Sequence, residues 1–270
     1  MKKFVSVLLC GLMAALCIAP AASASDYYAT ATYGTIVVDG EIDAAWADAE
    51  AFTANALKAG EEEGITTEWK AMWNEEYIYI LAVVNGDTAH FTGSQQSWGD
   101  GIELYFDILN SRPEDFATDD ACIQFGWHKD DLTYTAFKGT EQGIINSDGT
   151  YEIVCVENDN GYVYEFSLNV ADFCPAASMK DGTVMGFEIQ INSKNAEGDG
   201  RTAAYGWSDP DNAAWQYPYL MGDLELVPAP VVEEVVVEDI AAAPQTFDMG
   251  VIAAVAAVVS AAGYAISKKR

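Results

Sequence analysis

The clearest alternation of apolar and polar positions in this chain runs from Gly101 to Leu109. Its apolar side chains would point to one side of an extended segment, and Glu103, Tyr105 and Asp107 to the other. A period of two is typical of a strand that buries one face in a core. Trp98 precedes it, in a turn rich in glycine and aspartate where a large ring is hard to bury. An exposed aromatic beside outward carboxylates suits a polar ligand with apolar faces, such as a sugar. The alternative is a solvated strand face with the tryptophan folded over the edge of the sheet.

Short apolar or β-branched runs, separated by turn residues, recur through the rest of the body. They predict a strand beginning at Ile36, a helical turn from Asp43 to Glu50 that Asp43 caps, and a hairpin turn at 74–76. Trp46, in the helical turn, is expected to pack under the sheets. Further strands are predicted at 66–73, 77–84, 123–127, 132–137, 151–156, 162–168, 184–192, 203–207 and 224–227. Many short strands with little helix indicate an all-β fold, an antiparallel, jelly-roll-like β-sandwich with short helical turns.

The two ends of the chain read as targeting and anchoring segments. Residues 1–24 have the layout of a secretory signal peptide, with lysines, an apolar run and a small-residue cleavage site after Ala24. Residues 249–267 are an uncharged apolar run long enough to span a bilayer as a transmembrane helix, and residues 268–270 are a basic cytoplasmic tail. Residues 228–248 form a linker rich in proline, valine and glutamate. Residues 25–227 remain as one domain with a substantial core.

The segment Ala243-Pro-Gln-Thr-Phe-Asp248, followed by the apolar run and the basic end, also has the three-part layout of a cell-wall sorting signal. It resembles Leu-Pro-x-Thr-Gly, but Ala243 replaces the leucine and Phe247 the glycine. A sortase-type transpeptidase would cut after Thr246. The alternative is a plain single-span membrane anchor, which we favour because phenylalanine fits the motif poorly. Either route makes this a secreted protein held at the cell surface, membrane-anchored or wall-attached through its C-terminus.

Composition narrows the range of partners. The formal net charge of −29 argues against nucleic acid and anionic membrane surfaces and suits a secreted protein that holds calcium. The body retains three cysteines, Cys122, Cys155 and Cys174, an odd number that gives no disulfide framework. With His90 and His128 as the only histidines and no Cys-x-x-Cys pair, a zinc cluster is not expected.

A second unusual segment runs from Trp207 to Tyr219. It places two tryptophans and two tyrosines among aspartate, asparagine and proline, a composition suited to a surface. The alternative is a long loop whose aromatic side chains close one end of the sandwich.

Three segments taken together resemble a known family. They are Tyr33 to Trp46; Trp73 to Tyr79 with Trp98 and Glu103 to Asp107; and Trp207 to Trp215. In this order they resemble the family 9 carbohydrate-binding modules, which are appended to xylanases and other bacterial glycan-active proteins, and the likeness covers residues 29–227. It implies a β-sandwich that binds calcium and grips the reducing end of a sugar chain between two tryptophans.

Carried over to this chain, the resemblance implies that Trp98 and Trp215 form the slot. The hydroxyl partners would be Glu103, Gln190 and Asn212. Two departures concern the ligand. An arginine that binds hydroxyls in the family would fall near 124–126, where this chain has Gly126, and the spacing from Trp98 to Glu103 is one residue shorter. We therefore expect non-catalytic binding of a plant-type polysaccharide such as xylan or cellulose, or of its chain end, in support of glycan degradation, with the identity of the glycan open.

A structural calcium is expected as a cofactor, because acidic turns such as Asp115 to Asp120 offer the oxygen ligands that this ion prefers; the sequence does not select the ligands.

Three other functions are alternatives to carbohydrate binding. A glycoside hydrolase, or a weakly hydrolytic partner of one, would need two opposed carboxylates, whereas Glu103 and Asp107 fall on one strand face. A haem-binding electron carrier of similar sandwich shape would draw on Met72, Met185, His90 and His128, but nothing pairs them, so no haem is expected. A structural surface-layer or adhesion module would use the same fold without a ligand.

Overall fold

A computed structural model describes residues 25–88, 100–116, 121–128, 134–138, 141–143, 150–194 and 201–229, with backbone alone at 128, 134–138 and 141–143. The chain divides into two units, Met1–Pro230 and Val231–Arg270. The predicted signal peptide, anchor and basic tail lie outside the described residues. Among the described residues, no helix has the length and apolar character that crossing a bilayer requires.

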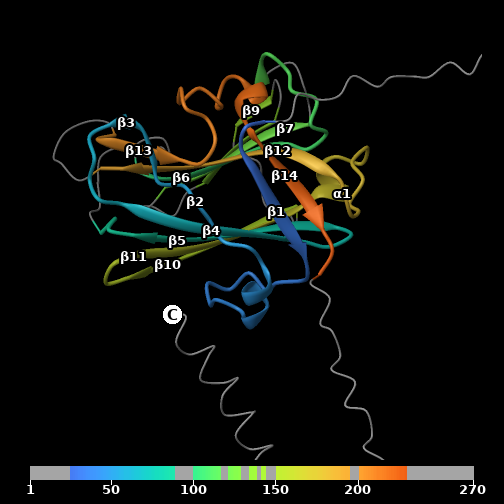
Figure 1. Ribbon diagram of the computed structural model, residues 1–270, viewed down its shortest axis with the longest axis horizontal. Helices are drawn as coiled ribbons and strands as arrows, with labels where there is room; N and C mark the ends of the chain where they lie inside the picture. Colours follow the sequence, from blue (N-terminus) through green and yellow to red (C-terminus); the bar gives the residue numbers. More distant parts are fainter. Residues whose placement is uncertain are drawn as a thin grey trace, which may run out of the picture. The chain divides into compact units, whose positions relative to one another are not determined.

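The described residues are almost entirely strands (Figure 1). In chain order the elements are β1 (Tyr28–Tyr33), the 3-10 helix η1 (Ala44–Asp48), β2 (Phe52–Thr53), β3 (Ala56–Gly60), β4 (Thr66–Trp73), β5 (Tyr77–Asn85), β6 (Gly101–Asp107), β7 (Cys122–His128), β8 (Tyr134–Lys138), β9 (Glu141–Gly143), β10 (Tyr151–Asn158), β11 (Gly161–Asn169), α1 (Val170–Phe173), β12 (Val184–Ser193), β13 (Ala203–Gly206), the 3-10 helix η3 (Pro218–Leu220) and β14 (Gly222–Val227). The predicted all-β class is confirmed.

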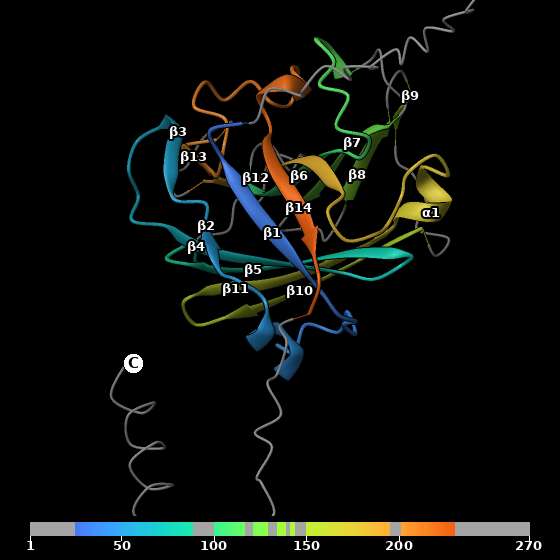
Figure 2. The ribbon, with the colours of Figure 1, turned by 45° about the vertical axis from the view of Figure 1, so that its right-hand side comes forward.

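The strands form two layers joined by one continuous hydrogen-bonded path (Figures 1 and 2). One layer has the order β10-β11-β5-β4, and the other has the order β12-β6-β7-β8-β9, with β13 on β12 and β3 on β13. β1 and β14 cross obliquely between them: β1 pairs in parallel with β4 and with β14, and β14 pairs antiparallel with β12. All other pairs are antiparallel, as the sequence predicts for a sandwich.

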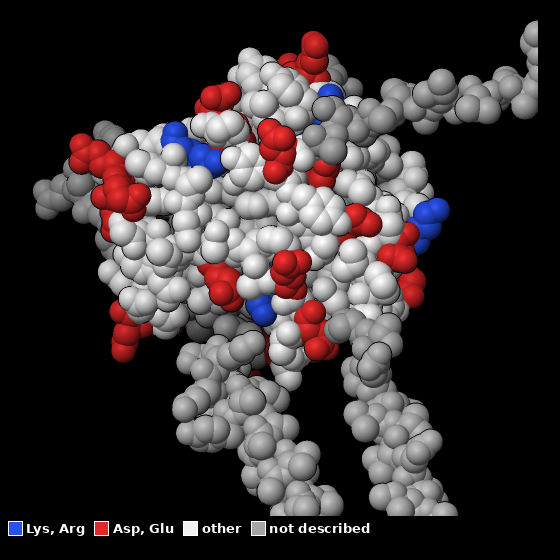
Figure 3. Space-filling view, viewed as in Figure 1, with Lys and Arg blue, Asp and Glu red and all other residues white. Residues whose placement is uncertain are grey.

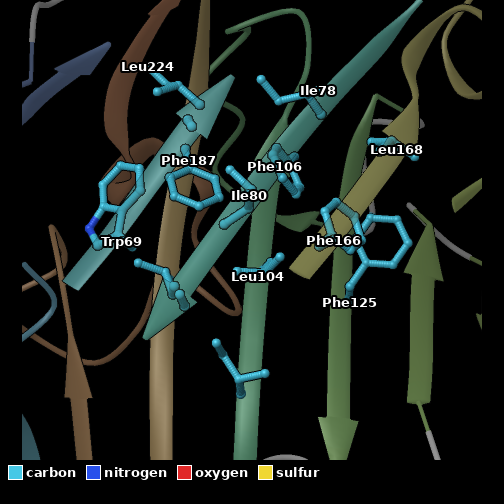
Figure 4. Close-up of a cluster of buried hydrophobic side chains, with 14 of the residues drawn as sticks. Trp69, Ile78, Ile80, Leu104, Phe106, Phe125, Phe166, Leu168, Phe187 and Leu224 are labelled. Carbon is cyan, nitrogen blue, oxygen red and sulfur yellow. The ribbon is translucent and has the colours of Figure 1, made fainter. Parts of the chain in front are cut away.

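The core lies between the layers and is built on large aromatic side chains (Figure 4). Phe106 on β6 stacks on Phe166 of β11 at a ring-centroid distance of 5.8 Å and meets Phe187 of β12 at 5.0 Å. Trp69 of β4 closes the group at 5.1 Å from Phe187. Full burial of one such side chain contributes about 1.5–3 kcal/mol, so this group of buried aromatic side chains dominates the stability of the domain.

The outer face of β4, β5 and β11 is covered by the segment that follows β1. Trp46 of η1 is 1% exposed and packs with Ile36, Met72, Tyr79 and Leu81, which confirms the prediction that it lies under the sandwich. Its indole Nε1 donates to Glu165 Oε1 at 3.0 Å. The strand predicted at Ile36 is wrong: this segment is an irregular crossing. The Asp43 side chain does not cap η1 but accepts from the Val37 N–H at 3.2 Å.

The prediction for β6 is half confirmed. Its apolar residues face the core, but the expectation that Glu103 and Asp107 face solvent is wrong, since they are 3% and 0% exposed. Tyr105 packs with Phe116, Cys122, Ala214 and Met221, of which all but Cys122 lie outside the strands. The face of β6 that points away from the main core is therefore also buried. Figure 3 shows the acidic side chains of the described surface scattered over one face, with far fewer basic ones.

Candidate functional site

A row of polar side chains runs across the outer face of the second layer. Glu103 of β6 lies directly opposite Gln190 of β12 on one side and Gly126 of β7 on the other. Its Oε2 accepts from Asn192 Nδ2 at 2.9 Å and from Gln190 Nε2 at 3.4 Å, and its Oε1 accepts from Gln124 Nε2 at 3.2 Å. Antiparallel pairing and a period of two bring these side chains together, because alternate residues of each strand share a face.

Tyr105 adds a hydroxyl to the same carboxylate, donating to Glu103 Oε2 at 2.8 Å. Burial raises the pKa of Tyr105 well above its usual value, and the negative charge of Glu103 raises it further. The phenol therefore stays protonated and remains a hydrogen-bond donor throughout the physiological range. A buried carboxylate is tolerated only where donors of this kind replace its hydration.

Asn192 joins this row to a cation. Its Oδ1 accepts from Gln190 Nε2 at 2.9 Å and from Arg201 Nη1 at 2.8 Å, while its Nδ2 donates to Glu103. Asn192 is fully buried, whereas Arg201 is only partly buried. We refer to Glu103, Gln124, Gln190, Asn192 and Arg201 as the polar row.

Glu188 lies on the same face of β12, two residues before Gln190, and anchors the neighbouring loop. Its carboxylate accepts from the backbone N–H groups of Trp207, Ser208 and Asp209, each at 2.7 Å, and from the Ser208 hydroxyl. Burial raises the pKa of Glu188, and these donors partly offset that effect. The start of the loop at 207–221 is therefore fixed to the sheet by a buried acceptor.

Asp209 shapes the next turn of that loop. Its carboxylate accepts from the N–H of Asp211 at 2.9 Å, of Ala214 at 2.6 Å, and of Ala213. Asn212 takes a positive φ of 54° within this turn, a conformation that asparagine tolerates better than most residues. Its carbonyl accepts from the Trp215 indole Nε1 at 3.1 Å.

The loop presents Trp215 to solvent. The indole is 53% exposed, the joint highest exposure of any aromatic side chain among the described residues. The preceding residue, Ala214, is buried against the cluster that contains Tyr105. Because Tyr105 bonds to Glu103, Trp215 and the polar row belong to the same face of the sheet. This is the candidate site.

The structure treats the predicted site residues differently. Trp215 is exposed as expected, and Glu103 and Gln190 are brought together, although they are 3% and 6% exposed. Asn212 contributes its carbonyl to the indole, and its side-chain oxygen is buried with no hydrogen-bond partner among the described residues. Trp98 lies outside the described residues, so the two-tryptophan slot stays a prediction.

Four neighbouring residues were missed by sequence reasoning: Tyr105, Gln124, Asn192 and Arg201. Asn192 follows Gln190 by two positions in a predicted strand, so strand periodicity alone would place it on the same face. Gln124 was noted only as the place where an arginine was expected; its amide bonds to Glu103, while Gly126 stands directly opposite Glu103.

The described residues include only some of those that the metal and haem hypotheses involve. No group of three or more potential metal-ligating side chains is found among the described residues. Most of the acidic turn at 115–120 lies outside them, so calcium stays a prediction. Met72 and Met185 are both buried in apolar clusters. His90 lies outside the described residues, and only the backbone of His128 is described.

Comparison with known proteins now decides the family. The model of the "Carbohydrate family 9 binding domain-like" family matches residues 38–229. The chain belongs to this family. The resemblance drawn from the sequence is thereby confirmed at the level of the family.

Relatives of this family 9 domain include parts of much larger enzymes. It is 30% identical over 200 residues to endo-1,4-beta-xylanase A of Thermotoga maritima, a match over 74% of this chain and 18% of that protein. It is 29% identical over 202 residues to exoglucanase XynX of Acetivibrio thermocellus, over 75% of this chain and 17% of that protein. The chain thus matches less than a fifth of the length of either relative.

Solved structures agree on the fold. A family 9 module from Caldicellulosiruptor kristjanssonii in complex with cellotriose has a TM-score of 0.61 and 22% identity, covering 82% of this chain and all of that one. The same organism's module in complex with glucose gives 0.60 and 22%, covering 75% and 97%. At this identity the likeness establishes a shared fold.

Proposed function

We propose that this family 9 domain binds a plant-type polysaccharide, or the end of its chain, without catalysing a reaction on it. The sugar is held between Trp98 and Trp215, with the polar row supplying hydrogen bonds. The observation that carries this proposal is Trp215: a large aromatic side chain, more than half exposed, on a loop that buried carboxylates hold in one conformation.

The chemistry of a pyranose matches this arrangement. Its C–H faces stack on an indole ring, while its equatorial hydroxyls need donors and acceptors in the plane of the ring. A stacked face and a well-placed hydrogen bond each contribute on the order of 1 kcal/mol net. Two aromatic faces and a few polar contacts predict a Kd roughly between micromolar and millimolar, after the cost of ordering the ligand.

Hydrolysis is disfavoured by the roles that the buried carboxylates already have. Glu103 is surrounded by donors from the two neighbouring strands, β7 and β12. Asp107 accepts from the N–H groups of Ser111 and Arg112 at 3.1 and 2.7 Å, which fixes the loop after β6. These residues share one strand face, whereas a glycosidase needs two carboxylates across a cleft. Binding is therefore the function that the geometry supports.

The setting of the domain is part of the proposal. Residues 1–24 direct export, and residues 228–270 hold the domain at the cell surface, where it would keep polysaccharide close to degrading enzymes. The relatives that join such domains to xylanases and an exoglucanase support that role. A structural calcium ion stabilises the domain in this proposal, with ligands that the described residues do not identify.

Titration of the full chain tests the binding function. The protein is purified in a detergent without a sugar headgroup, because a maltoside or glucoside would compete for the site. Glucose, cellotriose and xylotriose are added while tryptophan fluorescence and heat release are followed. Saturable binding of at least one of them is expected. No binding of any of these sugars, and no retention on insoluble xylan or cellulose, would contradict the proposal and favour a structural adhesion module.

A further inference from the structure

The backbone nitrogen of Ser25, just before β1, donates to a buried carboxylate. The acceptor is Asp223 Oδ2, at 2.8 Å. Asp223 is 7% exposed and lies opposite Tyr28 in the parallel pairing of β1 with β14. Ser25 is half-buried, and its hydroxyl accepts from the Tyr27 N–H at 3.1 Å. The Ser25 nitrogen therefore lies where these two strands begin to run side by side (Figure 2).

Asp223 is held in place from its other side by Arg112. The Arg112 guanidinium pairs with Asp223 Oδ1, and it also donates to the carbonyls of Met221 and Gly222. Both charged side chains are largely buried, with 14% of Arg112 and 11% of Asp223 exposed. The carboxylate thus has one oxygen on a fixed cation and turns the other toward the Ser25 nitrogen.

The cleavage site predicted from the sequence coincides with this bond, because it lies between Ala24 and Ser25. Hydrolysis of that peptide bond consumes one water. Its oxygen enters the new carboxylate of Ala24, and one hydrogen completes the amine of Ser25. A free α-amino group is largely protonated at neutral pH. The neutral amide that faces Asp223 in the precursor therefore becomes an ammonium group in the mature chain.

We propose that cleavage after Ala24 creates a structural ion pair between the α-ammonium group of Ser25 and Asp223. The inference rests on the export step of the proposed function and is independent of sugar binding. A charge-assisted hydrogen bond is roughly twice as strong as a neutral one. The chain has a formal net charge of −29, so its overall field favours an added cation. The seam between β1 and β14 then reaches its full stability only after the signal peptide has been removed.

Two forms of the chain test the contribution of the charge. One comprises residues 25–270, with Ser25 first, and the other residues 22–270, in which the Ser25 nitrogen is an amide as in the precursor. Each is released from a cleavable fusion and purified in detergent, and denaturant unfolding is followed by tryptophan fluorescence. The form that begins at Ser25 should have a folding equilibrium constant about fivefold to tenfold larger.

Two carboxylate variants, each made in both forms, show whether the charge acts through Asp223. In Asp223→Asn the difference in stability between the two forms should vanish. Asp26→Asn is the matched control, because Asp26 is an exposed carboxylate next to Ser25, and it should keep the difference. A difference that persists in Asp223→Asn would mean that the ammonium group acts without this partner, which overturns the inference.

Amine labelling detects the ion pair directly. An amine-directed reagent attacks only the deprotonated amine, so an ion-paired ammonium group reacts slowly. Mass spectrometry of the N-terminal peptide should show severalfold slower labelling of Ser25 in the mature wild type than in Asp223→Asn, with Asp26→Asn like the wild type. If Asp223→Asn does not fold, the native wild type is compared with the wild type in denaturant, and the exposed Lys180 serves as the internal standard.

The exported protein supplies the remaining test. Mass spectrometry of the chain recovered from producing cells should find Ser25 as its first residue, and a different first residue would overturn the inference. Equal stability of the two forms together with unprotected labelling of Ser25 would overturn it as well. None of these measurements uses a sugar, so these failures leave the binding function standing. A protein that binds no sugar but protects Ser25 would uphold the ion pair and remove the proposed binding function.

Discussion

The Ala214 N–H donates a 2.6 Å hydrogen bond to the buried carboxylate of Asp209, one position before the exposed indole of Trp215. The same carboxylate also accepts from Asp211 and Ala213. One buried acceptor therefore sets the conformation of the turn that presents the aromatic ring. An exposed tryptophan on a mobile loop would lose entropy on binding, whereas one held in this way has already lost it.

Replacing Asp209 should weaken both the fold and the site. Asp209→Ala leaves buried N–H groups without an acceptor, which predicts a loss of about 1–3 kcal/mol in the free energy of unfolding. Cellotriose binding should also weaken severalfold, because the Trp215 loop is no longer fixed. Denaturant unfolding and titration measure the two effects. Asp211→Ala, at an exposed position of the same loop, is the control and should change neither. An unchanged Asp209→Ala protein would show that this turn forms without its carboxylate.

Removing either slot tryptophan should abolish binding at small cost to stability. Trp215 is more than half exposed, so Trp215→Ala removes little buried surface while it deletes one stacking face. The same result is predicted from the sequence for Trp98→Ala. Fluorescence or calorimetric titration gives the affinities, and thermal melting gives the stability. Tyr33→Ala, an exposed aromatic at the far end of β1, should bind sugar like the wild type. Unaltered affinity in both tryptophan variants would refute the slot.

How far the sequence predicts this structure depends on whether a feature is local. Strong alternation located β4, β5, β6 and β12 within one or two residues. β1 was missed because its inward residues are alanines, which have low strand propensity, and because its parallel pairing with β4 and β14 depends on distant segments. The Ile36 segment has β-branched residues but covers a sheet face instead of joining it.

The site divides in the same way. Trp215 could be predicted as exposed because its loop is rich in aspartate, asparagine and proline, whereas Glu103 and Gln190 were grouped by the resemblance to the family. The burial of Glu103 could not be predicted, since its partners Gln190 and Asn192 lie 87 and 89 positions away along the chain. Arg201 sits just before a short strand, with no periodicity that would direct it toward Asn192.

Alkaline pH should test the seam between β1 and β14. The Tyr28 hydroxyl donates to Glu225, and this hydrogen bond, with smaller effects of burial and nearby carboxylates, raises the pKa of Tyr28 to about 12. In the unfolded chain the phenol ionises near its ordinary pKa of about 10. Its stabilising contribution is therefore complete below pH ~10 and is lost as the pH rises from about 10 to 12. The melting temperature of the wild type should fall toward that of Tyr28→Phe across this interval. A difference between the two proteins that stays constant with pH would contradict the assignment.

Calcium removal should lower the thermal stability of the domain. An ion that binds the folded state alone stabilises it by RT ln(1 + [L]/Kd), about 2.7 kcal/mol at a hundredfold excess over Kd. Dialysis against a chelator should reduce the melting temperature by several degrees, and calcium should restore it where magnesium does not. Elemental analysis of the purified protein gives the stoichiometry. A metal-free protein with an unchanged melting temperature would mean that the acidic turns are simply solvated.

The C-terminal segment should decide where the domain resides. If residues 249–267 form a single-span anchor, the intact chain stays in the detergent-soluble membrane fraction of the producing cells. If the motif before them is cut, a muralytic enzyme releases a form that ends at Thr246.

Thr246→Ala distinguishes the two routes, because it abolishes wall attachment but leaves a membrane span untouched. Deletion of residues 249–270 is the matched control and should move the protein to the medium in either case. We expect membrane retention in both the wild type and Thr246→Ala, since Phe247 replaces the glycine of the sorting motif. Recovery of the wild type from the medium alone would contradict both forms of attachment.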